Sequence, residues 1–253
     1  MNTTLTNGGQ QQQQQQNPCE RSGSTCVVVL LTPSHVICAN VGDSRAILRR
    51  NGKVLPLSFD QKPSEIPEKQ RILDAGGEVK GKRIDGDLAL SRAFGDYVYK
   101  EDKSRGPNEQ KVIAVPEIIV YPRDHASDEF IILACDGIWD VATNHQCSEF
   151  IQKLLSSGET NLVNICEESI DTCLDMNSRD NMTLMIIGLQ AMKMDRSSIA
   201  VMSNALWGLR ASRTARRFAS RTTAYTRNLA FSVGRDLRSE RTVSCARGPQ
   251  VCA

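Results

Sequence analysis

The feature that most constrains the fold is the apolar run 130–135, Phe-Ile-Ile-Leu-Ala-Cys, which ends abruptly on the acidic turn Asp136-Gly137-Ile138-Trp139-Asp140. A short apolar run bounded by a turn signal predicts a buried strand, with Asp136 at its end. A carboxylate held by a rigid strand is suited to binding a hard cation. An Asp-Gly pair after a strand is also an ordinary turn, so this segment alone leaves both interpretations open.

Two further aspartates occupy comparable places. Asp43 follows the apolar stretch 36–41 and Gly42, and Asp180 lies in the turn 177–181 before the strand-like stretch 182–189. Because each carboxylate lies at a strand end, separate segments can bring them to one site. Oxygen donors of this kind suit Mg²⁺ or Mn²⁺. A zinc site is disfavoured, because the chain has no Cys-x-x-Cys pair and only three His.

Six short motifs follow one another in a distinctive order. They are Ser-Gly-Ser-Thr at 22–25, Val-Gly-Asp-Ser-Arg-Ala at 41–46, Ala-Gly-Gly at 75–77, Leu-Ala-Leu-Ser-Arg-Ala-Phe-Gly-Asp at 88–96, Ala-Cys-Asp-Gly-Ile-Trp-Asp at 134–140 and Ser-Arg-Asp-Asn-Met-Thr at 178–183. In this order and spacing they resemble the metal-dependent type 2C protein serine/threonine phosphatases. The resemblance covers about residues 20–190.

The resemblance implies an α+β fold: an antiparallel β-sandwich flanked by helices in four αββα layers, here lacking the N-terminal strands. It also implies hydrolysis of phosphoserine and phosphothreonine in proteins by water that bridges two divalent cations. The complete family domain holds two or more Mg²⁺ or Mn²⁺ ions. Asp136 and Asp180 match family metal ligands, and Asp43 matches a residue associated with a further, more weakly held metal. The alternative for Asp43 is a strand-capping turn.

Two segments with which the family begins do not occur in this sequence: Arg-x-x-Met-Glu-Asp and Asp-Gly-His-Gly-Gly. They carry the bridging Asp, a His considered for proton transfer and an Arg that meets the phosphate. His35, His125 and His145 do not lie in matching contexts, so no catalytic side chain is assigned. We therefore expect a truncated phosphatase chain that is weak or inactive on its own.

Composition divides the chain into three parts. Residues 1–18 contain an unbroken glutamine run and predict disorder, and residues 19–190 carry the motifs. Residues 191–253 hold twelve Lys or Arg against three acidic residues, a net charge of +9, whereas the remainder has 19 basic and 26 acidic residues, a net charge of −7. This basic tail is expected to be disordered. Binding of nucleic acid or an acidic partner through it is the alternative.

Nine scattered Cys without framework spacing predict reduced thiols and therefore a cytoplasmic or nuclear protein. The apolar runs are too short to span a membrane. We expect a monomer that acts on phosphoprotein substrates.

Apolar periodicity predicts the elements of the motif-bearing part. We expect consecutive antiparallel strands at 25–31, 35–41 and 45–50, with a reversal at Asn51-Gly52, and later strands at 112–121, 129–135 and 182–189. Helices are expected at 64–75, capped by Ser64, and at 144–155 and 160–176. The charged loop 97–111 resembles the family's flap beside the active site. A plain surface insertion is the alternative.

Three functions remain open at this point. The first is a truncated type 2C phosphatase. The second is a noncatalytic relative that binds phosphoproteins or metals, and the third is an interaction protein that acts through its glutamine run and basic tail.

Overall fold

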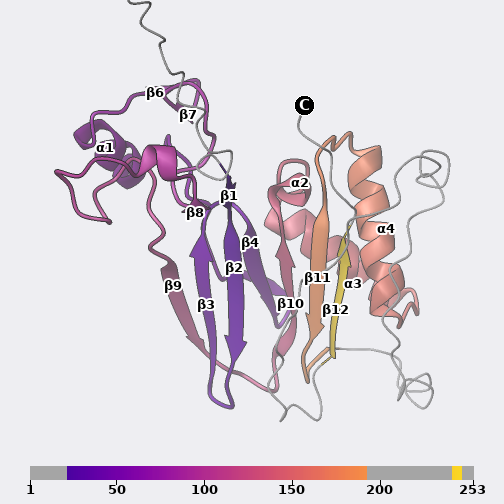
Figure 1. The fold of residues 1–253 in the computed structure, drawn as a ribbon. Helices are drawn as coiled ribbons and strands as arrows, with labels where there is room; N and C mark the ends of the chain where they lie inside the picture. The colour runs from indigo at the N-terminus through magenta and orange to yellow at the C-terminus, as the bar shows by residue number, and fades with distance from the viewer. Residues whose placement is uncertain (1–21, 193–240, 247–253) are drawn as a thin grey trace, which may run out of the picture.

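The computed structural model of this chain describes residues 22–192 and the backbone of residues 241–246. The expected segment 1–18 lies outside these residues, as does most of the expected tail 191–253. The chain forms two main antiparallel sheets (Figure 1). They stack on one another through a shared apolar cluster that includes Val36, Leu48 and Ile131. The three-stranded sheet has the order β2 (Cys26–Leu31), β3 (His35–Val41), β9 (Glu117–Pro122). The five-stranded sheet has the order β12 (Arg241–Ala246), β11 (Thr183–Gly188), β10 (Asp128–Ala134), β4 (Arg45–Arg50), β5 (Lys53–Pro56).

The chain passes from one sheet to the other between β3 and β4. The prediction that these two strands pair was wrong: β3 pairs with β2 and β9, whereas β4 pairs with β10 and β5. Gly42 allows the crossing, because its φ of +107° lies in a region that other residues rarely adopt. A β-carbon at Gly42 would also lie 2.4 Å from Cγ2 of Thr25. Asp43 consequently lies at the point where the chain changes sheets.

The central strands β4 and β10 of the five-stranded sheet are buried on both faces. Phe130 and Ile132 of β10 pack toward the helices, and Ile131 packs between the two sheets. Strand β4 alternates in the same way, with Ile47 facing the helices and Leu48 facing the other sheet. Burial on both faces explains why Ala46 to Leu48 in β4 and Phe130 to Ala134 in β10 are continuous apolar runs instead of alternating apolar and polar residues.

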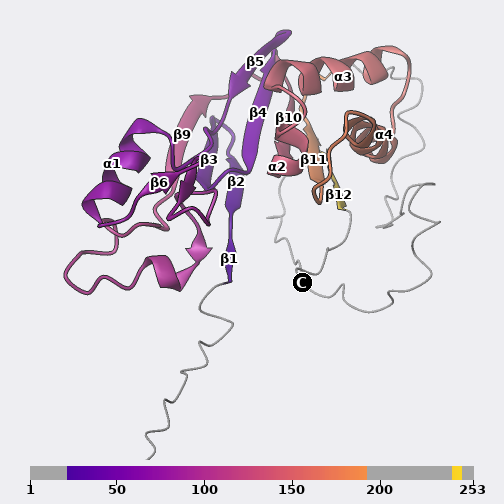
Figure 2. The same cartoon turned by 90° about the horizontal axis from the view of Figure 1, so that it is seen from above.

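Two helices cover the far face of the five-stranded sheet, α3 (Asn144–Ser156) and α4 (Leu162–Asp175) (Figure 2). Both predicted helices are confirmed. A capping box between Thr143 and Gln146 starts α3, and the Asn161 side chain accepts a hydrogen bond from the Val163 amide at the start of α4. The tail residues 241–246 contribute β12, which pairs with β11 along its whole length.

Six short elements form a cap at one end of the sandwich. They are β1 (Gly23–Ser24), α1 (Ile66–Asp74), β6 (Val79–Lys80), β7 (Arg83–Ile84), β8 (Phe94–Gly95) and the 3₁₀ helix η2 (Tyr97–Tyr99). The buried carboxylate of Glu68 holds the cap together, because it accepts hydrogen bonds from Arg71, Ser91 and Arg92. Ser64 does not cap α1, as its N-cap residue is Glu65.

The predicted sandwich is confirmed, with one helical layer on the five-stranded sheet. Among residues 22–192 and 241–246, α3 and α4 pack on the five-stranded sheet, whereas α1 packs within the cap, where Ile72 joins Ile84 and Val112. In that same part of the chain, every helix is too short or too polar to cross a bilayer.

Candidate metal-binding site

Three adjacent strands bring the predicted aspartates to one end of the five-stranded sheet. Ala134 of β10 pairs with Arg45 of β4 on one side and with Leu184 of β11 on the other. Asp136 follows that Ala by two residues and opens the short helix α2 (Asp136–Trp139). Asp43 lies two residues before Arg45, and Asp180 lies four residues before Leu184. The register of the sheet therefore places all three at the same end.

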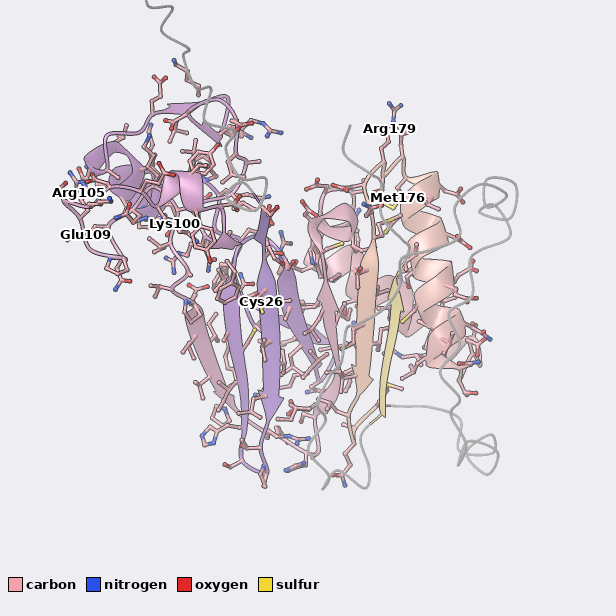
Figure 3. All side chains as sticks on the ribbon, viewed as in Figure 1. Cys26, Lys100, Arg105, Glu109, Met176 and Arg179 are labelled. Atoms are coloured by element: carbon pink, nitrogen blue, oxygen red, sulfur yellow. The ribbon has the colours of Figure 1, made fainter. Side chains whose placement is uncertain are left out.

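Direct contacts join the Asp136 turn to the Asp180 turn. The Ser178 hydroxyl donates a hydrogen bond to the Gly137 carbonyl at 2.7 Å. The Cys135 thiol donates to the Asn181 carbonyl at 3.3 Å and accepts from the Thr183 amide at 3.2 Å. Gly137 is required here, because a β-carbon would lie 2.4 Å from the Asn181 carbonyl oxygen. The exposed Arg179 points away from the molecule at the tip of its turn (Figure 3).

The Asp43 carboxylate is buried and forms an ion pair with Lys62. The backbone around it is fixed, since the Gly42 amide donates to Oε1 of Gln61 at 2.6 Å. Burial lowers the pKa of Lys62, but the hydrogen bond to Asp43 and the charges of Asp43, Asp60 and Asp136 raise it overall. The Lys62 ammonium is therefore the positive charge nearest to this carboxylate.

Negative charge accumulates around Asp136. Burial raises the pKa of its half-buried carboxyl, and the charges of Asp43, Asp180 and Asp140 raise it further, while Lys62 partly offsets them. A carboxyl with this many acidic neighbours is stabilised by any added cation. The charges of Asp43 and Asp180 therefore both act on Asp136, and their role as metal ligands stays a prediction.

The three aspartates offer the type of donor atom that divalent cations bind. Carboxylate oxygens suit Mg²⁺ and Mn²⁺, and the like charges around Asp136 favour a cation there. The geometry is less complete, because no group of three or more His, Cys, Asp and Glu side chains is arranged to hold a metal ion anywhere in the described part of the chain.

Lys62 and Asp140 were not predicted as site residues. Asp140 is in the same motif as Asp136, and its amide donates to the Asp136 carbonyl at 2.8 Å. Its position four residues after Asp136, about one helical turn further on, could have predicted that the two carboxylates are neighbours. Lys62 lies in the irregular segment after β5, where no periodic pattern identified it.

Arg45 connects the segments that surround the Asp136 turn. Its guanidinium makes two hydrogen bonds of 2.8 Å to Asp60, donates to Oδ1 of Asn144 at 2.6 Å, and lies 5.1 Å from the centre of the Trp139 ring. These contacts connect β4, the segment after β5, α2 and the start of α3. The arrangement fixes the position of the helical turn that carries Asp136.

The loop 97–111 is ordered around the buried side chain of Gln110. Its amide nitrogen donates to the carbonyls of Asp102, Arg105 and Gly106 at 2.8, 3.2 and 3.4 Å, and its amide oxygen accepts from the Asp102 amide. The loop borders a cavity of about 640 Å³ whose lining includes Phe94 and Tyr97. Lys100, Arg105 and Glu109 lie on this side of the molecule (Figure 3).

Comparison with known proteins agrees with the motifs. The family model described as "Protein phosphatase 2C" matches residues 2–182. The chain is 47% identical over 171 residues to Protein phosphatase 1B of Rattus norvegicus, covering 68% of this chain and 43% of the relative. It is 48% identical over 168 residues to Protein phosphatase 1A of Homo sapiens, covering 66% and 44%.

A solved structure is also similar, that of a phosphatase from a pathogenic strain of Toxoplasma gondii. The TM-score is 0.59 at 35% identity, with 62% of this chain and 49% of that chain covered. The chain thus spans less than half the length of these curated relatives. The motifs, the sandwich and the matched family model agree, and the chain belongs to the protein phosphatase 2C family.

Proposed function

We propose that this chain takes part in metal-dependent hydrolysis of phosphoserine and phosphothreonine in proteins, with Asp136, Asp180 and Asp43 as ligands of Mg²⁺ or Mn²⁺. The observation that carries the proposal is the electrostatic setting of Asp136. Its carboxyl is half-buried among three other carboxylates, and Lys62 partly offsets their charge. Such a site lowers its free energy by binding a cation.

Each residue has a separate task in this proposal. Asp136 and Asp180 supply oxygens from two turns that Gly137, Ser178 and Cys135 hold together. Asp43 supplies a third oxygen once a cation displaces the Lys62 ammonium. When bound, the metal ions would activate water and neutralise phosphoryl oxygens. Lys62 remains nearby as a positive charge that can face an anionic substrate.

We further propose that the chain alone is weak or inactive. Support comes from the lack of a three-ligand group among the described residues, because two divalent cations need more oxygen donors than these three aspartates provide. The same observation supports a second candidate, a phosphatase-like module that binds metal or phosphoprotein without turnover. A cytoplasmic or nuclear location fits either function.

The test combines metal binding with turnover. Mn²⁺ binding is measured by calorimetry for the chain, for Asp136→Ala and for the control Asp175→Ala, whose exposed carboxylate lies at the end of α4. We expect binding that Asp136→Ala abolishes and Asp175→Ala preserves. If the unmodified chain does not bind Mn²⁺, the proposed metal site is refuted.

Phosphopeptide hydrolysis with and without Mn²⁺ then separates the two candidates. We expect little or no turnover by the chain alone. Robust turnover that Asp136→Ala removes would refute the claim of inactivity and establish the enzyme. Trace turnover that Asp136→Ala removes would favour the weak enzyme, and metal binding without any turnover, even at high enzyme concentration, would favour the noncatalytic module.

A further inference from the structure

A polar side chain lies in the apolar layer between the two sheets. Alternate residues of β3 point into that layer, and two of them, Val36 and Cys38, belong to its apolar cluster. The next is Asn40, which is fully buried. Its Nδ2 donates to the carbonyls of Gly42 and Phe59, both at 3.1 Å, while its Oδ1 has no hydrogen-bond partner among the described residues. An unpaired buried acceptor costs stability, so packing alone does not explain an asparagine at this position.

A second buried amide side chain, that of Gln61, also binds Gly42. The Gly42 amide donates to Oε1 of Gln61 at 2.6 Å, and the Gln61 amide donates to the Gly42 carbonyl at 3.0 Å. Nε2 of Gln61 donates to the Asn40 carbonyl at 3.3 Å. Both polar backbone groups of Gly42 are therefore held by Asn40 and Gln61. We call these two residues the amide clamp.

The amide clamp lies directly beside the ion pair of the candidate site. Asp43 follows Gly42, and Lys62 follows Gln61. The Gly42 carbonyl belongs to the planar peptide unit that leads into Asp43, so the hydrogen bonds to this carbonyl fix the orientation of that unit. Gln61 is itself fixed, because its carbonyl accepts hydrogen bonds from the amide and the hydroxyl of Ser91 at 3.1 and 2.8 Å. A shift in the clamp would therefore move Asp43 relative to Lys62.

We infer that Asn40 and Gln61 are positioning residues for Asp43: they set its backbone so that its carboxylate can face either Lys62 or a divalent cation. The contact with the cation rests on the proposed function, whereas the contact with Lys62 needs no metal. The backbone of Asp43 stays in place while its side chain exchanges the Lys62 ammonium for the metal. A preset backbone lowers the cost of ordering a ligand when the ion binds. A purely structural clamp would instead stabilise the crossing from β3 to β4 without affecting the ion pair.

A double-mutant cycle tests the positioning without any metal. Urea unfolding of Asp43→Asn, Lys62→Met and the double variant, in buffer free of divalent ions, measures the coupling between the two side chains. We expect this coupling to change the unfolding equilibrium constant of the unmodified chain by about tenfold. It should fall to about twofold or less when Gln61→Met removes the acceptor of the Gly42 amide. An unchanged coupling would overturn the positioning role.

Gln110→Met is the matched control, because Gln110 is also a buried glutamine whose side chain holds backbone groups, in this case within the loop 97–111. It should leave the coupling unchanged. Loss of coupling in this control as well would overturn the positioning role, since it would show a general loss of packing. Asn40→Ala is a second variant of the clamp that keeps the Gln61 amide as a donor to the Gly42 carbonyl. It decides the question if Gln61→Met does not fold.

Calorimetric titration with Mn²⁺ tests the contact with the cation. Gln61→Met and Asn40→Ala should weaken binding by about fivefold or more, and Gln110→Met should not. Affinities of both clamp variants equal to that of the unmodified chain would overturn the role of the clamp toward the metal. If the unmodified chain does not bind Mn²⁺ but the coupling falls as expected, the proposed function fails while the positioning of Asp43 against Lys62 is confirmed.

Discussion

The α-carbon of Gly137 lies so close to Asn181 that a β-carbon added to it would be 2.4 Å from the Asn181 carbonyl oxygen. This contact joins the turn of Asp136 to the turn of Asp180. The distance between the two carboxylates therefore depends on a residue that carries no side chain.

Gly137→Ala should destabilise the fold by about 1–3 kcal/mol, because the Asn181 backbone must move to make room. Urea unfolding measures the change. Gly106→Ala is the matched control, since a β-carbon there meets nothing closer than 3.6 Å, and its effect should stay within about 0.5 kcal/mol. Mn²⁺ affinity should fall in Gly137→Ala alone. Equal stabilities of the two variants would contradict this account of the contact.

Lys62→Met should increase the affinity of the site for Mn²⁺ by about tenfold, because it removes a positive charge that competes for Asp43. The measurement is calorimetric titration at low ionic strength. Lys53→Met removes the same charge from an exposed position in β5 and should change the affinity little. Weaker binding after loss of Lys62 would show that it positions Asp43 for the metal instead of competing with it.

Glu68→Gln should reduce stability at pH 7 by about 3 kcal/mol, since it removes a buried charge partner of two arginines. Burial raises the pKa of Glu68, but the hydrogen bonds from Arg92 and Ser91 and the charges of Arg71 and Arg92 lower it overall from its ordinary value of 4.5. A lowered pKa in the folded state contributes stability above pH 4.5. That contribution is lost as the pH falls through the folded pKa.

The difference between Glu68→Gln and the unmodified chain should therefore shrink in acid. Urea unfolding at several pH values between 7 and about 3 measures it. Glu65→Gln, an exposed neighbour whose side chain does not cap the helix, should show a small difference throughout. A gap that stays constant across this range would contradict the lowered pKa.

Gln110→Ala should loosen the loop 97–111 without unfolding the sandwich, because three carbonyls lose their donor. Hydrogen exchange followed by mass spectrometry should show faster exchange over residues 102–110 and unchanged exchange in β10. Asn108→Ala, at an exposed position in the same loop, serves as the comparison. Faster exchange in both variants would mean that Gln110 has no special part in ordering the loop.

The strands and helices that carry the site were predictable where a continuous or periodic apolar pattern coincided with burial. The run 130–135 became β10 because both of its faces are covered, and the helices α3 and α4 followed from their apolar stripes and capping residues. The neighbourhood of the three aspartates followed from the position of each at a strand end.

Other features depended on contacts between distant segments. The crossing from β3 to β4 was missed because a Gly-Asp-Ser turn looks the same whether the next strand pairs or changes sheet. Strand β9 begins only at Glu117, after Pro116, because the Val112 and Ile113 amides bind the Tyr99 and Ser91 carbonyls instead. Ser64 failed as a cap because the turn from Lys62 to Glu65 delays the helix.

Because the chain changes sheets at Gly42, β4 pairs with the distant β10 instead of its neighbour β3. This long-range pairing has a consequence for the folding rate. The three aspartates come from positions 43, 136 and 180, and they converge only when β4, β10 and β11 have paired across these long separations. Pairings so distant along the chain close late in folding. Divalent ions should accordingly leave the refolding rate unchanged and slow unfolding, since they recognise an arrangement that exists only once the sandwich has assembled.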